Sequence, residues 1–424
     1  MPDYRLLVTA SASQELLAFD AATLSVRFRI ALADALPGAV AFHPDGKRAF
    51  VTHLQGSHID VVDLDRQKIT SQLELPKRGT GLSGGSIGFD VERFPDHAMS
   101  AVVSPGGTRL YVAHVMVNTG ASQAGFGSGG YGLGAPLPIV ATVATFDLAS
   151  GKLLRSPVSA QGVQLDSLRD KRFQLAEDSL PNPGFVEDQQ VQQLSQPVAL
   201  AVDPRFARLF LVAMGSDRVM TLDAAVADPI GRPQQVIAVG HAPRGIAITA
   251  DGRRAFVHNG QGFSVSVSDL SRPAFQEVGR YELQAEREFA IGKDPLPPEA
   301  AQGRRLFTYA LDNRVGGAAR FACASCHPEG RQDGLTWHVG LGPRQTPILA
   351  DRLDGTAPFN WIGSEHELSL NVKSTIARLG GTGIEDKERA ALSAYITHYL
   401  PPLDNPHRGA EDPAVVARGK ALFE

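Results

Sequence analysis

The stretch that decides the fold of this chain is residues 39–53, AVAFHPDGKRAFVTH, in which an apolar strand, a Pro-Asp-Gly turn and a second strand follow one another. Similar sequences recur three times, as SAVVSPGGTRLYVAH at 100–114, ALAVDPRFARLFLVA at 199–213 and GIAITADGRRAFVHN at 245–259. Short strands joined by tight turns and repeated in this way are typical of radial blades, whose edges are protected by neighbouring blades. The repeat therefore predicts a β-propeller over residues 1–285.

The β pattern stops in an acidic, Pro-rich linker at residues 286–300. Beyond it, apolar residues recur at helical spacing in residues 299–309 and 385–400, on either side of a loop-rich middle. A small α-helical domain is therefore predicted at residues 301–402. The expected fold class is multidomain β + α, and a length of 424 residues, which exceeds one ordinary core, agrees with it.

Both cysteines of the chain lie in residues 323–327, CASCH, within the predicted helical domain. Two thiols at this spacing, followed by a histidine, are typical of covalent haem attachment, in which the sulfurs add to the haem vinyl groups. A structural zinc site is disfavoured because a second cysteine pair is missing, and a redox dithiol would be expected beside a βαβ pattern. We therefore expect haem c on Cys323 and Cys326, with His327 as an iron ligand, in a cytochrome c domain.

The two parts of the chain resemble two known families. Residues 1–285 resemble the YVTN β-propellers through FVTH at 50–53 and YVAH at 111–114. Residues 303–400 resemble the first haem domain of bacterial di-haem cytochrome c peroxidases and the related MauG enzymes. That resemblance rests on the motif followed by three further segments and Leu368, in the family's order: DG at 333–334, GPRQTP at 342–347 and PFNWIG at 358–363. Gln345 and Ile362 depart from the family, which has asparagine and aspartate there.

The haem-domain resemblance implies that Trp361 is the tryptophan between two haems, where it relays electrons, with simple packing on the porphyrin edge as the alternative. It also implies that His338 is a removable distal iron ligand. His366, His398 and His407 are alternatives to His338. A methionine ligand is disfavoured, because all five methionines precede residue 221.

In catalysis, Asn371 corresponds to the family's active-site glutamine, while Gly380-Gly381 stand in place of its glutamate. Because glycine cannot transfer a proton, peroxidase activity would need a substitute such as Glu365, Glu367 or Glu385, each of which also suits a solvated surface position.

The end of the chain repeats the start of the cytochrome domain. QGRRLF at 302–307 returns as RGKALF at 418–423, after a Pro-rich linker. We expect residues 403–424 to hold this linker and the start of a second cytochrome c domain, with its own haem in a longer protein.

Charge and hydropathy restrict the location of the chain and its partners. A net charge of −4 gives no basic surface for nucleic acid, and no apolar run reaches the ~20 residues of a membrane span. Residues 1–20 show neither the basic start nor the unbroken apolar core that is typical of a signal peptide. Haem c attachment nevertheless implies a periplasmic or otherwise exported protein, so the signal is expected to be missing or removed.

The sequence therefore predicts an exported haem c oxidoreductase of the di-haem peroxidase and MauG type, in which the propeller positions a substrate or partner. Its partners would be a redox partner protein, or peroxide or another small-molecule oxidant. Two alternatives remain: a non-enzymatic electron carrier, and a propeller binding module with a redox-sensing haem. His53, His114 and Asn259 hold equivalent blade positions and could form a ring that binds a metal, although polar residues at strand ends commonly satisfy backbone groups.

Overall fold

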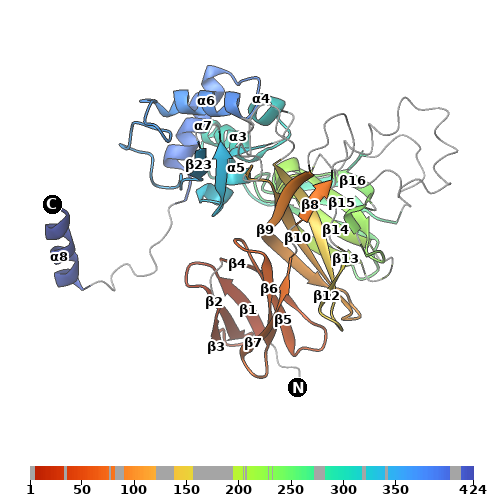
Figure 1. The fold of residues 1–424 in the computed structure, drawn as a ribbon. Coiled ribbons are helices and arrows are strands. Elements are labelled where there is room, and N and C mark those ends of the chain that lie inside the picture. Colours follow the sequence, from red (N-terminus) through yellow and green to blue (C-terminus); the bar gives the residue numbers. More distant parts are fainter. Residues whose placement is uncertain are drawn as a thin grey trace, which may run out of the picture.

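The structure is a computed structural model of the chain, and its first part is built from β-sheets in which all strand pairs but one are antiparallel (Figure 1). The described residues are 5–32, 36–75, 78–81, 90–120, 138–155, 194–203, 205, 208–227, 229–231, 233–271, 282–317, 321–339, 342–401 and 412–424.

Two sheets account for the described residues up to position 75. The first sheet consists of β1 (Arg5–Ala10), β2 (Glu15–Asp20) and β3 (Val26–Ala31). The second consists of β4 (Pro37–Phe42), β5 (Arg48–His53), β6 (His58–Asp63) and β7 (Lys68–Glu74). The repeat at residues 39–53 therefore forms the β4–β5 hairpin, as predicted.

Three further sheets follow in chain order. The third has the order β12 (Lys152–Arg155), β11 (Ile139–Asp147), β10 (Arg109–Val117), β9 (Asp90–Val103) and β8 (Arg78–Gly81). The fourth contains β13 (Pro197–Asp203), β14 (Arg208–Ala213), β15 (Arg218–Asp223), β16 (Pro233–Ala238) and β20 (Glu282–Gln284). The fifth contains β17 (Pro243–Ile248), β18 (Arg254–Asn259), β19 (Ser264–Asp269) and β21 (Arg287–Ala290).

The first strand of each repeat contacts the first strand of the next, in the order β1, β4, β9, β13 and β17. The apolar side chains fill the spaces between successive sheets. Ala49 and Val51 of β5 pack toward the first sheet, whereas Phe50 between them packs with Leu110 and Val112 of the third. Burial on both faces explains why the repeats read as nearly continuous apolar runs. Blades stacked in this way agree with the predicted β-propeller.

The last strand of the fifth sheet falls inside the segment predicted as a linker. β21 pairs with β19, so the β part extends to Ala290, five residues beyond the predicted boundary at 285. All four side chains of β21 are exposed. The strand therefore has no apolar alternation that sequence reasoning could detect.

The helical part begins at Pro298. Its helices are α3 (Pro298–Thr308), α4 (Asn313–Gly316), α5 (Cys323–Cys326), α6 (Leu368–Arg378), α7 (Asp386–His398) and α8 (Pro413–Phe423). A hairpin of β22 (Thr336–Val339) and β23 (Gly342–Gln345) lies between α5 and α6 in the chain. The helices predicted at 299–309 and 385–400 are confirmed as α3 and α7.

Helices α3 and α7 cross at Gly303. A Cβ atom on Gly303 would lie 2.2 Å from the carbonyl oxygen of Ala391 and 2.8 Å from Cβ of Tyr395. Only glycine allows the two backbones to approach this closely. Around the crossing, Phe307 and Leu392 belong to the core of the helical domain.

The helical domain is joined to the fourth sheet by a partly buried ion pair. Arg305 on α3 binds Asp217 through both guanidinium nitrogens, and Ala310 N donates to Gly215 O at 2.8 Å. Burial, the largest single influence, would raise the pKa of Asp217. Hydrogen bonds from His241 and Arg305 outweigh it and lower that pKa.

We predict that Gly303→Ala lowers the free energy of unfolding by about 2 kcal/mol, because the new methyl group overpacks the α3–α7 crossing. Gly419→Ala is the matched control, since a Cβ at Gly419 in α8 meets nothing within 4 Å. Urea unfolding followed by far-ultraviolet circular dichroism measures both variants. Equal destabilisation by the two substitutions would contradict this account of the crossing.

Asp217→Asn is expected to lower stability at pH 7 by about 2 kcal/mol, because Arg305 loses a charged partner. Since the folded-state pKa of Asp217 is depressed, its stabilisation is present above the unfolded value of about 3.9 and is lost as pH falls through the folded value. The difference between parent and variant should therefore shrink from pH 7 to pH 3 in urea titrations. Asp354→Asn, on an exposed carboxylate, serves as the control. A deficit independent of pH would count against the ion pair.

Candidate functional site

The CASCH motif forms a single helical turn with its histidine at the C-terminal end. Cys323 and Cys326 are the first and last residues of α5, and this spacing of three places both sulfurs on one side of the turn. The Ser325 hydroxyl accepts from Ala322 N at 3.1 Å, and His327 N donates to Cys323 O at 2.8 Å. The two thiols are free.

The two cysteines contact different hydrophobic clusters. Cys323 packs against the helical core, which includes Leu306 and Val372. Cys326 packs against a cluster that contains Trp337 from the β22–β23 hairpin and Val115 from β10 of the third sheet. A group attached to both sulfurs would therefore lie where the helical core meets a wall supplied by the β part.

Both thiols are neutral. Burial raises the pKa of Cys323 to about 11 and that of Cys326 well above its usual range. A reactive dithiol needs a depressed pKa, so this environment disfavours redox-dithiol chemistry. It suits thioether links, which carry no charge.

The imidazole of His327 is also neutral. Burial lowers its pKa to about 4, and the backbone carbonyls of Pro347 and Arg331 offset this only in part. Its Nδ1 is buried and makes no hydrogen bond within ordinary geometric limits. A neutral imidazole is the form that binds a metal ion, so Cys323, Cys326 and His327 together fit a covalently attached haem.

Asp333 holds the hairpin beside the motif in place. Its Oδ2 accepts from Trp337 Nε1 at 2.8 Å and from Thr346 Oγ1 at 2.9 Å, and its Oδ1 accepts from Leu335 N. Burial raises the pKa of Asp333 despite these hydrogen bonds. The DG at 333–334 marked a family resemblance in the sequence, but its link to Trp337 depends on the fold.

The third sheet covers the hairpin. Val117 packs with Trp337, which is 1% exposed, and His338 N donates to Thr119 O at 2.8 Å. Gly334 lies against Gln55 in the turn between β5 and β6, because a Cβ on Gly334 would be 2.6 Å from Gln55 Cδ. The wall of the candidate site therefore contains residues of both domains.

Trp361, the proposed relay, joins the same cluster as Cys326 and Trp337. It is half-buried, and the guanidinium carbon of Arg378 lies 4.9 Å from the centre of its ring. The structure therefore brings Trp361 to the motif, where it packs and where a cation rests on its face.

His338, the proposed distal ligand, follows Trp337 directly in β22. Adjacent strand residues point to opposite faces, so the two side chains leave the hairpin on different sides. His366 and His398 are exposed, and His407 lies outside the described residues. The distal ligand stays a prediction.

Asn371 lies in the first turn of α6 and is half-buried. Gly381, at the place of the family glutamate, packs directly on α4: a Cβ there would lie 2.4 Å from Arg314 O and 2.5 Å from Val315 O. Backbone contact of this kind leaves no room for a side chain. The glycine is thus explained by packing, and no proton-transfer group stands in its place.

Neither the protein-family models nor the curated proteins compared with this sequence gave a match. Among solved structures, the periplasmic gluconolactonase of Pseudomonas aeruginosa is similar, with 18% identity over 69% of this chain and 70% of that chain and a TM-score of 0.42. A protein of unknown function from Desulfotomaculum acetoxidans has 14% identity over 68% of this chain and 66% of its own, with a TM-score of 0.41. The dihydro-heme d1 dehydrogenase NirN has 16% identity over 64% of this chain and 42% of its own, with a TM-score of 0.36.

None of the helices within the described ranges combines the length and apolar character needed to cross a bilayer.

The two tryptophans test the account of the site wall. Trp337→Phe should lower the free energy of unfolding by about 3 kcal/mol, because it leaves a cavity and removes a donor from buried Asp333. Trp361→Phe, on the half-buried ring, should cost less than about 1 kcal/mol. Urea unfolding followed by far-ultraviolet circular dichroism compares them. A cost for Trp361→Phe that equals or exceeds that of Trp337→Phe would show the roles of the rings to be misassigned.

Proposed function

We propose that this protein is an exported haem c oxidoreductase of the di-haem cytochrome c peroxidase and MauG type, with a β-propeller that positions a substrate or a redox partner. The observation that carries the proposal is a single helical turn that bears two half-buried, neutral thiols and is followed directly by a half-buried, neutral imidazole. This donor set fits haem c better than it fits zinc or a dithiol. The periplasmic or otherwise exported location follows from the same attachment chemistry.

When bound, the haem iron supplies one-electron transfer. The residues of the chain would bind this group and shield it from water. Cys323 and Cys326 anchor the group, His327 offers its imidazole nitrogen, and the Asp333–Trp337 pair keeps the adjoining hairpin rigid. Val115 of the third sheet excludes water beside Cys326, so the propeller would influence both the access of an oxidant and the local polarity.

A non-enzymatic electron carrier is the second candidate, and two observations favour it. Gly381 packs on α4 and leaves no proton-transfer side chain at the place where the peroxidases have glutamate. The Arg378 guanidinium above Trp361 opposes removal of an electron from that ring, since a nearby positive charge disfavours a radical cation. Under this reading, Asn371 has no catalytic role and Trp361 packs at the edge of the haem.

We also propose that residues 412–424 begin a second cytochrome c domain. Helix α8 has a sequence similar to that of α3, and all residues of α8 are exposed. Gly303 in α3 receives a crossing helix, whereas the corresponding Gly419 has nothing within 4 Å. The face of α8 is thus open to a helix like α7, and a second haem would follow in a longer protein.

Haem attachment is tested with material produced in a host that exports the protein and matures c-type cytochromes. The parent should give a pyridine haemochrome spectrum typical of haem c and the mass of the polypeptide plus one haem for residues 1–424. Cys323→Ser combined with Cys326→Ser should abolish both signals. Ser325→Ala, between the two cysteines, should retain them. A colourless parent with the mass of the bare polypeptide would refute the proposal.

Peroxide separates the enzyme from the carrier. Oxidation of the reduced iron by peroxide, with turnover of an electron donor, is expected of the enzyme, whereas the carrier should exchange electrons without consuming peroxide. Electron paramagnetic resonance of His338→Ala tests the distal ligand, because loss of a sixth ligand converts a low-spin signal into a high-spin signal. An unchanged low-spin signal would exclude His338 from the iron.

A further inference from the structure

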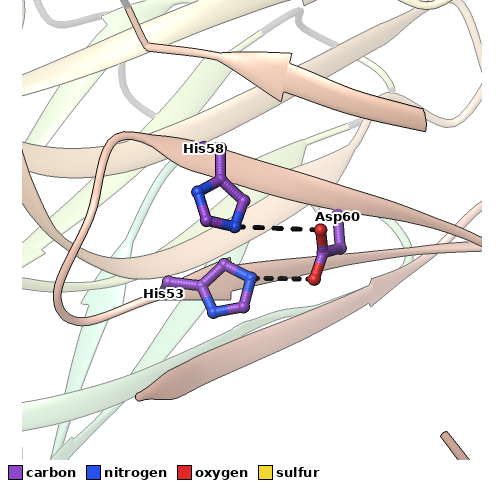
Figure 2. Close-up of side chains that lie close together, drawn as sticks. All are labelled: His53, His58 and Asp60. Atoms are coloured by element: carbon purple, nitrogen blue, oxygen red, sulfur yellow. Dashed lines mark hydrogen bonds and ion pairs between the residues drawn. The ribbon is translucent and has the colours of Figure 1, made fainter. Parts of the chain in front are cut away.

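A second group of metal-ligand side chains lies in the second sheet, outside the CASCH motif (Figure 2). His53 ends β5 and His58 begins β6, and the pairing of Thr52 with Ile59 places these two histidines opposite one another. Asp60 lies two residues after His58, so both project from the same face of β6. Sequence reasoning grouped His53 with His114 and Asn259 of other blades, but the structure groups it with two residues of its own hairpin.

The three side chains converge within the range of a single ion. His53 Nε2 lies 3.1 Å from Asp60 Oδ2, and His58 Nε2 lies 3.8 Å from Asp60 Oδ1. One potential ligand atom from each residue lies within 4.8 Å of the other two. Ligand atoms bound to zinc at about 2.0–2.2 Å are separated by roughly 3–4 Å, so only a small adjustment would bring the set around an ion.

Polar atoms in this group lack hydrogen-bond partners. His58 Nε2 and His53 Nδ1 are buried and unpartnered, and the distance of 3.8 Å from His58 to the carboxylate is too long for a hydrogen bond. An unpaired buried nitrogen is costly, and an ion at His58 Nε2 would remove that cost.

The Asp60 carboxylate is buried and held in one orientation. His53 and Asp60 are both 0% exposed. Gln72 Nε2 donates to Asp60 Oδ1 at 2.9 Å and fixes the orientation of the carboxylate, as outer partners of metal ligands commonly do.

The fifth sheet provides an internal comparison. At the equivalent end of the β18–β19 hairpin, Asn259 replaces His53, Ser264 replaces His58 and Ser266 replaces Asp60. There, Asn259 Nδ2 donates to both hydroxyls, at 3.0 and 2.9 Å. Ser264 Oγ in turn donates to the Glu288 carboxylate of β21, so a blade corner can be built without histidine, and the fold alone does not require His53 and His58 in the second sheet.

We propose that His53, His58 and Asp60 bind one divalent transition-metal ion of the Zn²⁺ class. Two imidazoles and one carboxylate are the nitrogen and oxygen ligands that this class prefers, and a water molecule would complete a tetrahedron. His58 is the ligand nearest to solvent, with 18% of its side chain exposed, so the ion enters past it. The ion would join the ends of β5 and β6 and stabilise the turn between them.

The haem-loaded protein is first stripped of loosely held metal with a chelator, then incubated with zinc chloride and desalted. We expect one zinc per chain by elemental mass spectrometry, counted separately from iron, and a rise of several degrees in the melting temperature. His58→Ala should lose at least 90% of the zinc and the thermal shift. His258→Ala, on an exposed histidine of β18, should retain both.

A triple variant guards against a substitution that merely unfolds the protein. His53→Asn, His58→Ser and Asp60→Ser together copy the hairpin of the fifth sheet, whose side chains form their own hydrogen bonds. It should fold, keep the haem and bind no zinc. A parent without stoichiometric zinc, or equal zinc in the parent and the triple variant, would overturn the proposal and leave a buried His53–Asp60 pair.

Discussion

The face-to-face packing of successive β-sheets is the constraint on which the rest of the structure depends. A single sheet of this size cannot bury its apolar residues alone, and β5 shows the solution, because Ala49 and Val51 pack on one neighbour while Phe50 packs on the other. The need to bury apolar side chains between neighbouring elements also applies to the helical domain. Val115 and Val117 of the third sheet bury Trp337, so one sheet serves both the β part and the helical domain.

Because of this shared packing, residues of both domains surround the candidate haem site. Cys323 belongs to the helical core, whereas Cys326 belongs to the cluster that the third sheet completes. A partner that binds the propeller and shifts the third sheet would therefore change the surroundings of the attached group without touching the iron. The Arg305–Asp217 pair and the hydrogen bond between Ala310 and Gly215 hold the two domains together, so that the third sheet can pack on Trp337.

The two candidate sites solve the problem of buried polar groups in different ways. Around the CASCH motif, burial keeps the thiols and His327 neutral, which suits covalent attachment and ligation of an iron held by a porphyrin. In the second sheet, the fully buried carboxylate of Asp60 lies 3.1 Å from His53 Nε2 and 2.9 Å from Gln72 Nε2. A charge in such a place is tolerated only with compensation, which the proposed divalent cation would supply.

The sequence by itself determined the features that arise locally. Repeated apolar strands with tight turns specified the hairpins, helical spacing specified α3 and α7, and CASCH placed two sulfurs on one turn. Only the tertiary structure decided which distant residues meet: Cys326 with the third sheet, and Gly381 with α4. Exposed β21 and the convergence of His58 with Asp60 also escaped prediction, because strand pairing and side-chain approach depend on packing between elements and leave no apolar period in the chain.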